Sequence, residues 1–126
     1  MAHIYLSSPY THQSETVRAL RHDRAALTTA RLMEQGWVVF SPIVHAYTVA
    51  EFMDSDRKLD HDFWMRQARG MLRTAAYVVV LQIEGWDKSR GVREEILLAK
   101  ENSIPIRYLG EHEQPPSPAK LARAVA

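Results

Sequence analysis

The chain has 126 residues, the length of one compact domain, so a single domain spanning residues 1–126 is predicted. Hydrophobic residues make up 46% of the sequence and charged residues 25%, a globular balance that excludes a disordered chain. The net charge of +1 argues against general binding to a nucleic-acid backbone, and no nucleic-acid partner is predicted. The absence of cysteine excludes disulfides, thiolate metal sites and cysteine nucleophiles.

No membrane segment is predicted either. The longest apolar run, residues 75–81, is far shorter than the roughly 20 residues that a membrane-spanning helix needs. The amino-terminal residues 1–10 lack the basic start and long apolar stretch of a signal peptide. We therefore expect a soluble, cytoplasmic protein with no membrane partner.

Short β-rich runs alternate with longer helical segments along the chain. Ser14 is a suitable cap for the first helix, and Gly36 is a suitable residue to end it. In chain order we expect a strand at 3–7, a helix at 14–35, a strand at 37–40, a short helix and a charged loop within 46–59, a helix at 60–74, a strand at 77–83, a loop at 84–90, a helix at 91–102, an edge strand at 105–109 and a short helix after 118.

This alternation predicts the α/β class: a three-layer sandwich with a parallel four- to five-stranded sheet, flavodoxin/Rossmann-like, with helices on both faces. Ligands of such sheets bind at the carboxyl ends of the strands. The segments expected to hold a site are therefore 7–12, 41–47 and 84–95.

The first two of these segments each allow two interpretations. The small hydroxyl residues of Ser7-Ser8-Pro9-Tyr10, just before a helix, suit an anion, or they form a turn and a helix cap. No glycine-rich phosphate loop is present. In the second segment, His45 is a candidate for ligand binding or proton transfer, or a structural histidine.

The third segment, residues 85–95, is the most informative, because it contains adjacent glutamates. At about 100° per residue, Glu95 lies about 60° from Val92, near the apolar stripe of the predicted helix, whereas Glu94 falls on the polar side. Glu94 is interpreted as a partner of the helix dipole or a capping group. A carboxylate that faces the protein must be satisfied or functional, so Glu95 is a candidate nucleophile or base.

Two further groups of residues do not predict a site. The acidic run over residues 54–62 resembles calcium-loop spacing only loosely and lacks the loop glycine, so it is interpreted as solvated surface. The six histidines include no i, i+4 pair on a helix, so no metal site and no cofactor are predicted.

Four motifs of the sequence together resemble a known family. They are Ile4-Tyr5-Leu6-Ser7-Ser8-Pro9-Tyr10, Phe40-Ser41-Pro42-Ile43 with His45, Gly85-Trp86, and Ser89-x-Gly91-Val92-x-x-Glu95. Through these motifs the sequence resembles the nucleoside 2-deoxyribosyltransferase superfamily over residues 3–109. It is most similar to a small bacterial and phage branch, and it also resembles the nucleotide N-glycosidases, which hydrolyse nucleoside 5′-monophosphates to a base and a sugar phosphate.

The resemblance implies a role for each matching position. Glu95 matches the catalytic glutamate that attacks the anomeric carbon, and Tyr5 matches a tyrosine that orients this glutamate or the sugar. Ser8 and Tyr10 match the turn that lines the sugar and phosphate, with Ser7 and Pro9 in the same motif. Gly91 lets the substrate approach the start of the helix.

The sequence departs from the pattern at the second acid. Relatives have an aspartate four residues after the tryptophan of a Phe-Trp pair; here Trp64 is followed by Ala68, which the helical wheel places on the inward side. Three explanations account for this alanine: the protein has naturally lost the activity, another acid replaces the aspartate, or the aspartate was deliberately substituted. Asp62 falls on the polar side, so His45 is the preferred substitute.

At the substrate's 5′ end, unphosphorylated-nucleoside transferases carry an aspartate at the position of Ser89. A serine there favours a 5′-phosphate, to which Arg90, and Arg18 or Arg21 on the first helix, would add positive charge. In the alternative interpretation, Ser89 only caps the third long helix.

The predicted activity is an N-glycosidase, a hydrolase acting on a nucleoside 5′-monophosphate. The alternatives are a deoxyribosyltransferase, a non-catalytic nucleotide-binding protein and a flavodoxin-like interaction module. The expected partner is a small-molecule nucleotide or nucleoside. A homodimer or higher homo-oligomer is also predicted, by resemblance and from Trp37, Trp64 and Trp86.

Overall fold

The computed structural model describes residues 2–54 and 56–120. Its parallel four-stranded sheet has the strand order β2-β1-β3-β4, and the α/β sandwich predicted from the sequence is confirmed. The strands are β1 (Ile4–Ser7), β2 (Val39–Phe40), β3 (Tyr77–Gln82) and β4 (Ile106–Gly110). The helices are α1 (Glu15–Glu34), α2 (Pro42–Glu51), α3 (His61–Leu72) and α4 (Arg90–Glu101), with the short 3₁₀ turns η1 (Asp56–Leu59) and η2 (Trp86–Lys88).

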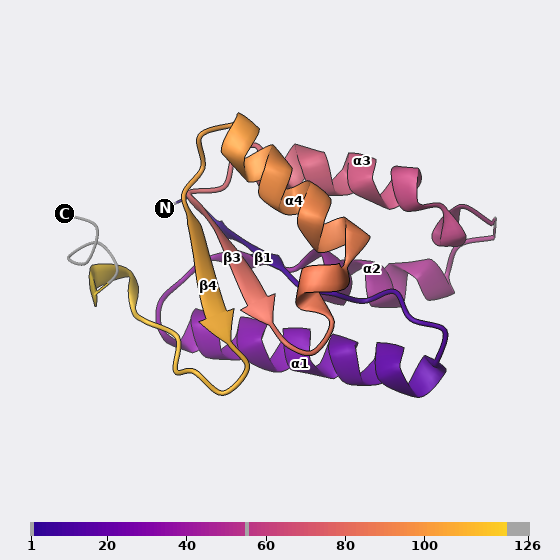
Figure 1. Ribbon diagram of the computed structural model, residues 1–126, viewed down its shortest axis with the longest axis horizontal. Coiled ribbons are helices and arrows are strands. Elements are labelled where there is room, and N and C mark those ends of the chain that lie inside the picture. Colours follow the sequence, from indigo (N-terminus) through magenta and orange to yellow (C-terminus); the bar gives the residue numbers. More distant parts are fainter. Residues whose placement is uncertain (1, 55, 121–126) are drawn as a thin grey trace.

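The helices cover the two faces of the sheet unequally, as Figure 1 shows. On one face, Leu32 of α1 packs against Ile4, Leu6 and Val79. On the other face, α3 and α4 pack side by side over Tyr5, Val78 and Val80, through buried residues that include Ala68, Leu72, Val92 and Ala99. The strand period of two explains this division, because alternate side chains of a strand point to opposite faces. One consequence is that Tyr5 and Ser7 both face α4.

Most predicted elements are confirmed within one to three residues, but the segment after β2 differs. The expected helix within 46–59 begins earlier, at Pro42, with the Ser41 hydroxyl accepting a hydrogen bond from the Val44 N–H over 3.2 Å. Ser41-Pro42 therefore ends the strand and also starts the helix, because proline is favoured in the first helical turn. His45 lies in this helix rather than in a loop.

Two other differences concern chain segments at the edge of the fold. Only Val39 and Phe40 of the expected strand 37–40 pair with β1, and Trp37 is instead buried with its indole N–H donating to the Pro116 oxygen over 2.7 Å. The helix expected after residue 118 lies mostly outside the described residues. Among the helices that the structure describes, none has the length and apolar character needed to cross a membrane.

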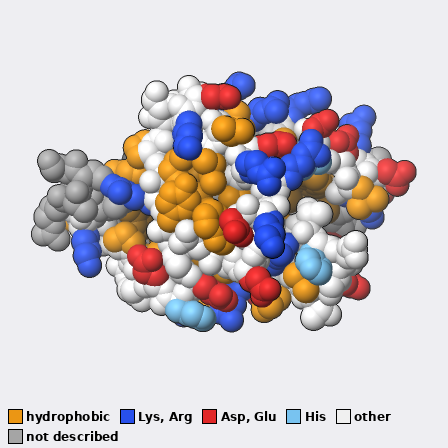
Figure 2. Space-filling model, viewed as in Figure 1, with side chains coloured by type: hydrophobic (Ala, Val, Ile, Leu, Met, Phe, Trp, Pro, Cys, Tyr) orange, Lys and Arg blue, Asp and Glu red, His pale blue; other side chains and the backbone are white. Residues whose placement is uncertain are grey.

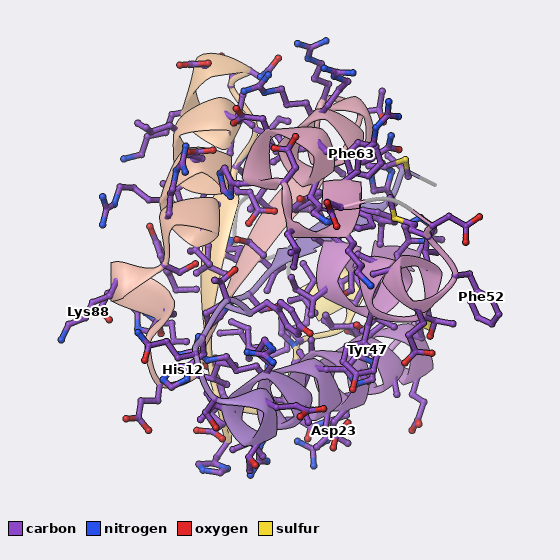
Figure 3. The ribbon with its side chains drawn as sticks, turned by 90° about the vertical axis from the view of Figure 1, so that its right-hand side faces the viewer. His12, Asp23, Tyr47, Phe52, Phe63 and Lys88 are labelled. Carbon is purple, nitrogen blue, oxygen red and sulfur yellow. The ribbon has the colours of Figure 1, made fainter. Side chains whose placement is uncertain are left out.

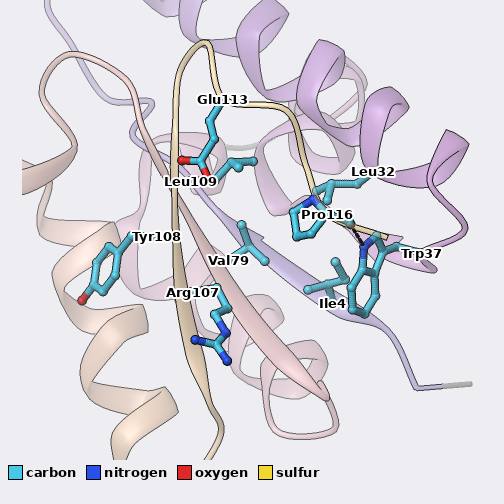
Figure 4. Close-up of a pocket in the computed structure, with 9 residues that line it drawn as sticks. All are labelled: Ile4, Leu32, Trp37, Val79, Arg107, Tyr108, Leu109, Glu113 and Pro116. Carbon is cyan, nitrogen blue, oxygen red and sulfur yellow. Dashed lines mark hydrogen bonds between the residues drawn. The ribbon is translucent and has the colours of Figure 1, made fainter. Parts of the chain in front are cut away.

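A small cavity of about 160 Å³ lies on the α1 face, where the segment after β4 crosses the sheet (Figure 4). Its walls are mainly apolar and include Leu32, Trp37, Val79 and Pro116. Arg107 and Glu113 are the charged residues at its border, and the Glu113 carboxylate accepts a hydrogen bond from the Gly110 N–H over 3.0 Å. This cavity is too small for a nucleotide, because ligand pockets typically measure about 300 Å³ or more.

Candidate active site

A much larger cavity, about 1050 Å³, opens at the carboxyl edge of the sheet. The loops after β1 and β3 and residues of all four α-helices form its walls. In the view of Figure 3, His12 and Lys88 lie on one side, Tyr47 of α2 lies across from them, and Phe52 points outward. The cavity combines the three segments that the sequence singled out, so the predicted location of the site agrees with the larger of the two cavities described.

Glu95 is the buried carboxyl group of this cavity, with 5% of the residue exposed. The Ser7 hydroxyl donates to Glu95 Oε1 over 2.9 Å, and the Tyr5 hydroxyl donates to Oε2. Because Tyr5 and Ser7 are two residues apart on β1, they point to the same face and hold both carboxylate oxygens at once. The contact with Tyr5 agrees with the role that the resemblance implies; the bond from Ser7 was not foreseen.

Burial dominates the electrostatics of this cluster. Loss of hydration raises the pKa of Glu95 to about 7, although the hydrogen bonds from Tyr5 and Ser7 act in the opposite direction. The pKa of the Tyr5 hydroxyl is raised well above its usual value by burial and by the adjacent Glu95 charge. Near neutral pH, Glu95 is therefore poised between its ionised and protonated forms.

Glu94 lies in a different environment one residue earlier. Its carboxylate accepts from Arg90 Nε over 3.0 Å and contacts His61 Nε2 at 2.9 Å. The hydrogen bond from His61 is the main reason that the pKa of Glu94 is lowered, and Arg90 adds to it. Glu94 does not cap the helix, because Ser89 caps α4: its hydroxyl accepts from the Val92 N–H over 3.2 Å. Glu94 also lies beyond the first turn of α4, the turn in which a partner of the helix dipole is expected. Glu94 instead ties α4 to the start of α3.

The turn after β1 has one polar group without a protein partner. Ser8 is 4% exposed, borders the cavity, and its Oγ has no hydrogen-bond partner in the part of the chain that the structure describes. Pro9 is buried beside it, and Tyr10 lines the cavity. A buried hydroxyl without a partner is costly, so the free Ser8 oxygen favours a ligand group in the cavity.

Arg21 holds this turn to the loop after β3. Its guanidinium donates to the Thr11 oxygen over 2.9 Å and to the Glu84 oxygen over 3.3 Å. Gly85, with a positive φ of 91°, makes room for it, since a Cβ there would lie 2.4 Å from Arg21 Nη2. Arg18 borders the cavity, but Arg21 is not among the residues that line it, so its part is to join two loops of the site rather than to bind phosphate.

The start of α4 also borders the cavity. Ser89 lines it while capping the helix, so the two interpretations of this serine are compatible. A Cβ on Gly91 would meet only the Ser89 Oγ, at 3.9 Å. The protein's own packing therefore does not require glycine there, which fits close approach by a ligand.

The remaining predicted residues lie on the walls formed by α2 and α3. Exposed His45 borders the cavity with its ring centroid 5.5 Å from that of Phe40. Trp64 lines the cavity while its indole N–H donates to the Lys58 oxygen over 2.9 Å. Ala68 is 4% exposed and faces inward, as the helical wheel predicts. The sequence singled out neither Lys58 nor His61, which also line the cavity.

No group of three or more His, Asp or Glu side chains within residues 2–54 and 56–120 is arranged to hold a metal ion. In the acidic run, Asp60 caps α3 by accepting from the Asp62 and Phe63 N–H groups. Figure 2 shows Lys and Arg side chains gathered over α3 and α4, interleaved with acidic ones.

The sequence matches, over residues 2–111, the family described as a domain of unknown function, DUF1937. The chain belongs to this family. No curated protein matches the sequence. Among solved structures, this DUF1937 protein is similar to the 2-deoxyribosyltransferase of the psychrotolerant bacterium Bacillus psychrosaccharolyticus. The TM-score is 0.63 at 19% identity, with 86% of this chain and 72% of the other covered. The nucleoside 2-deoxyribosyltransferase-like fold predicted from the sequence is thus confirmed.

Proposed function

We propose that this protein is an N-glycosidase that hydrolyses the bond between base and sugar of a nucleoside 5′-monophosphate. The observation that carries the proposal is the buried Glu95 carboxyl, held by the Tyr5 and Ser7 hydroxyls at the wall of a nucleotide-sized cavity. The fold shared with a 2-deoxyribosyltransferase supports the same class of chemistry.

In the proposed reaction, ionised Glu95 attacks the anomeric carbon while the bond to the base breaks, and the electron pair of that bond goes to the base. The hydroxyls of Tyr5 and Ser7 fix the carboxylate for this attack. Water then cleaves the glycosyl ester: its oxygen bonds to the anomeric carbon, one of its protons is released to solvent, and Glu95 leaves as a carboxylate. A base that is uncharged in the nucleotide would leave as an anion, so it must take up a proton as the bond breaks. His45 at the border of the cavity is the proposed donor of this proton.

The proposed phosphate subsite lies at the start of α4. Ser89 and Gly91 line the cavity there, and Lys88 and Arg90 bring positive charge to the same border. The first N–H groups of a helix favour an anion. Ser8, whose hydroxyl has no partner among the described residues, and Tyr10 face the same cavity and are proposed to contact the sugar.

Two other functions are favoured by particular observations. Transfer of deoxyribose to a second base, instead of to water, is supported by the solved 2-deoxyribosyltransferase of the same fold. A nucleotide-binding role without turnover is supported by Ala68, which leaves the buried wall of the cavity without a second acid.

Release of free base from a panel of nucleosides and 5′-monophosphates tests the proposal. Release from 5′-monophosphates that stops in the Glu95→Gln variant is the expected result. Release only in the presence of an acceptor base would identify a transferase. Tight binding of a monophosphate without release, measured by calorimetry, would identify a binding protein.

The predicted homo-oligomer and cytoplasmic location stay predictions. The tryptophans no longer support an interface, because each packs within the chain: Trp37 is buried, Trp64 is bonded to Lys58, and Trp86 packs against Tyr108 with ring centroids 5.8 Å apart. Light scattering at micromolar concentration measures the oligomeric state, and a monomer would contradict the prediction.

A further inference from the structure

The buried carboxyl of Glu95 lacks a cationic partner. Both of its hydrogen-bond donors, Tyr5 and Ser7, are neutral hydroxyls. No ion pair formed by the described residues includes Glu95. Removing a carboxylate from water is costly unless an opposite charge compensates it. A ligand that brings positive charge to Glu95 would supply this compensation.

The wall beside this cluster is apolar. Ala68 of α3 belongs to the same buried cluster as Tyr5, and Trp64 and Met65 line the cavity with it. The other carboxyl side chains that line the cavity in the described part of the chain are Glu15 and Glu51, and both are exposed. Glycosidases commonly use a second carboxyl group to protonate the leaving group. The buried part of this cavity has none.

Other proton donors lie toward the outer part of the cavity. Exposed His12 accepts the Ser14 N–H at its Nδ1 over 2.9 Å, and half-buried His61 is bonded through Nε2 to Glu94. His45 is exposed. Burial raises the pKa of Tyr10, which makes this phenol a weaker acid near neutral pH. A base that must be protonated in order to leave therefore depends on an exposed donor such as His45, whereas a base that leaves without a proton needs no donor.

Building on the proposed function, we infer that the preferred substrate is a nucleoside 5′-monophosphate whose base carries a positive charge, such as an N-alkylated purine. When the bond between base and sugar breaks, its electron pair neutralises the charged ring, so the base leaves as a neutral molecule without a proton. Glu95 forms the ester bond to the anomeric carbon. Water then cleaves the ester, and the proton of that water is released to solvent.

The walls of the cavity suit the two ends of such a substrate. On the α1 and α2 side lie Glu15, Glu51 and the rings of Tyr10, Phe40 and Tyr47, and ring faces attract cations. Arg18 is also on this side and keeps its positive charge while it donates to the backbone oxygens of His12 and Gln13, so the two carboxylates of Glu15 and Glu51 outnumber it. Lys58 of η1, Lys88 of η2 and Arg90 of α4 also line the cavity, and their positive charges suit a phosphate.

Guanosine 5′-monophosphate and its 7-methyl derivative are the test pair, since they differ by one methyl group and one positive charge. Release of base is measured as kcat/KM, with the release in the Glu95→Gln variant subtracted. The 7-methyl compound is expected to exceed its parent by about 100-fold or more, the contribution of a general acid that only the parent needs.

Variants at Ala68 sharpen the test. Ala68→Asp supplies an acid in the buried wall, so it should raise kcat/KM for the parent by about tenfold or more. The ratio of kcat/KM for the 7-methyl compound to that for the parent should therefore fall. Ala68→Asn fills the same space without an acidic proton, and the ratio should not narrow. Cleavage of both compounds at rates within about tenfold would overturn the substrate inference and leave the proposed function standing. Release of neither base above the Glu95→Gln background, while other 5′-monophosphates are cleaved, would overturn the substrate inference alone. Release of base from no 5′-monophosphate at all would overturn both the substrate inference and the proposed function.

Discussion

Two adjacent glutamates face different neighbours from α4, and their environments shift their pKa values in opposite directions. Glu95 faces β1, where burial raises its pKa to about 7. Glu94 faces α3 and solvent, where His61 and Arg90 lower its pKa. The same side chain is thus kept partly protonated in one place and ionised in the other. Burial and the charge of the neighbours, rather than residue type, decide which glutamate is suited to catalysis.

The largest contrast between them is expected in turnover. Glu95→Gln removes the proposed nucleophile and should lower kcat by about 10⁴-fold or more. Glu94→Gln keeps the shape of the side chain and loses charge only in the half-exposed contact with His61 and Arg90. Its effect should stay within a few-fold. Base release under saturating substrate measures both, and equal losses would contradict the assignment of Glu95.

The second contrast is in stability. Because the folded pKa of Glu95 lies near 7, above its unfolded value of about 4.5, the folded state binds more protons between these values. Its contribution to stability is therefore fully present below the unfolded pKa and lost as pH rises toward 7. With each pKa unit worth about 1.4 kcal/mol, ionised Glu95 costs up to about 3 kcal/mol.

Glu95→Gln should consequently raise the free energy of unfolding above about pH 8, by up to about 3 kcal/mol, and show a smaller fall in stability on going from about pH 5 to 8. Glu94→Gln, which removes an ion pair, should lower stability slightly at the same pH. Urea unfolding at both pH values measures the difference. A Glu95→Gln variant less stable than the unmodified protein at the higher pH would contradict the raised pKa.

A smaller effect, on the pH dependence of the reaction, is expected from replacing Tyr5, which bonds to Glu95 but not to Glu94. Its hydroxyl favours the ionised form of Glu95, so Tyr5→Phe should raise the pKa of Glu95 further. The acidic midpoint of the pH profile of kcat/KM should move up by about one pH unit, because a hydrogen bond to a charged group contributes about 1.5 kcal/mol or more. Ser7→Ala is the matched test of the other oxygen. An unchanged midpoint in both variants would show that Glu95 does not control the profile.

The contrast also shows what sequence patterns reveal. Helical spacing placed Glu95 inward and Glu94 outward, and the strand pattern placed Tyr5 on β1. Contacts between distant segments have no such signal: the Arg21 bond to Glu84 joins residues 63 apart, and His61 and Glu94 are 33 apart. The bond from Ser7 had a signal, since Tyr5 and Ser7 share a strand face.

Helix starts were harder to locate than helix faces. Ser41-Pro42 was a stop signal for β2, but the same pair caps and starts α2. His45 consequently lies within α2, whereas the sequence predicted only that it follows the end of a strand. The pattern of a strand followed by serine and proline is therefore consistent with a direct passage into a helix.

The last contrast concerns Ser89, which caps the helix that carries both glutamates. Ser89→Asp retains a good capping side chain, so α4 should still form, but it places a negative charge at the proposed phosphate subsite. Binding of a 5′-monophosphate should weaken by about tenfold or more, while the matching nucleoside binds as well or better. Ser89→Asn, a neutral capping residue, is the control, and calorimetric titration of one base in both forms is the measurement. In the unmodified protein the monophosphate should bind more tightly; tighter binding of the nucleoside would remove the phosphate subsite from the start of α4 and favour the transferase.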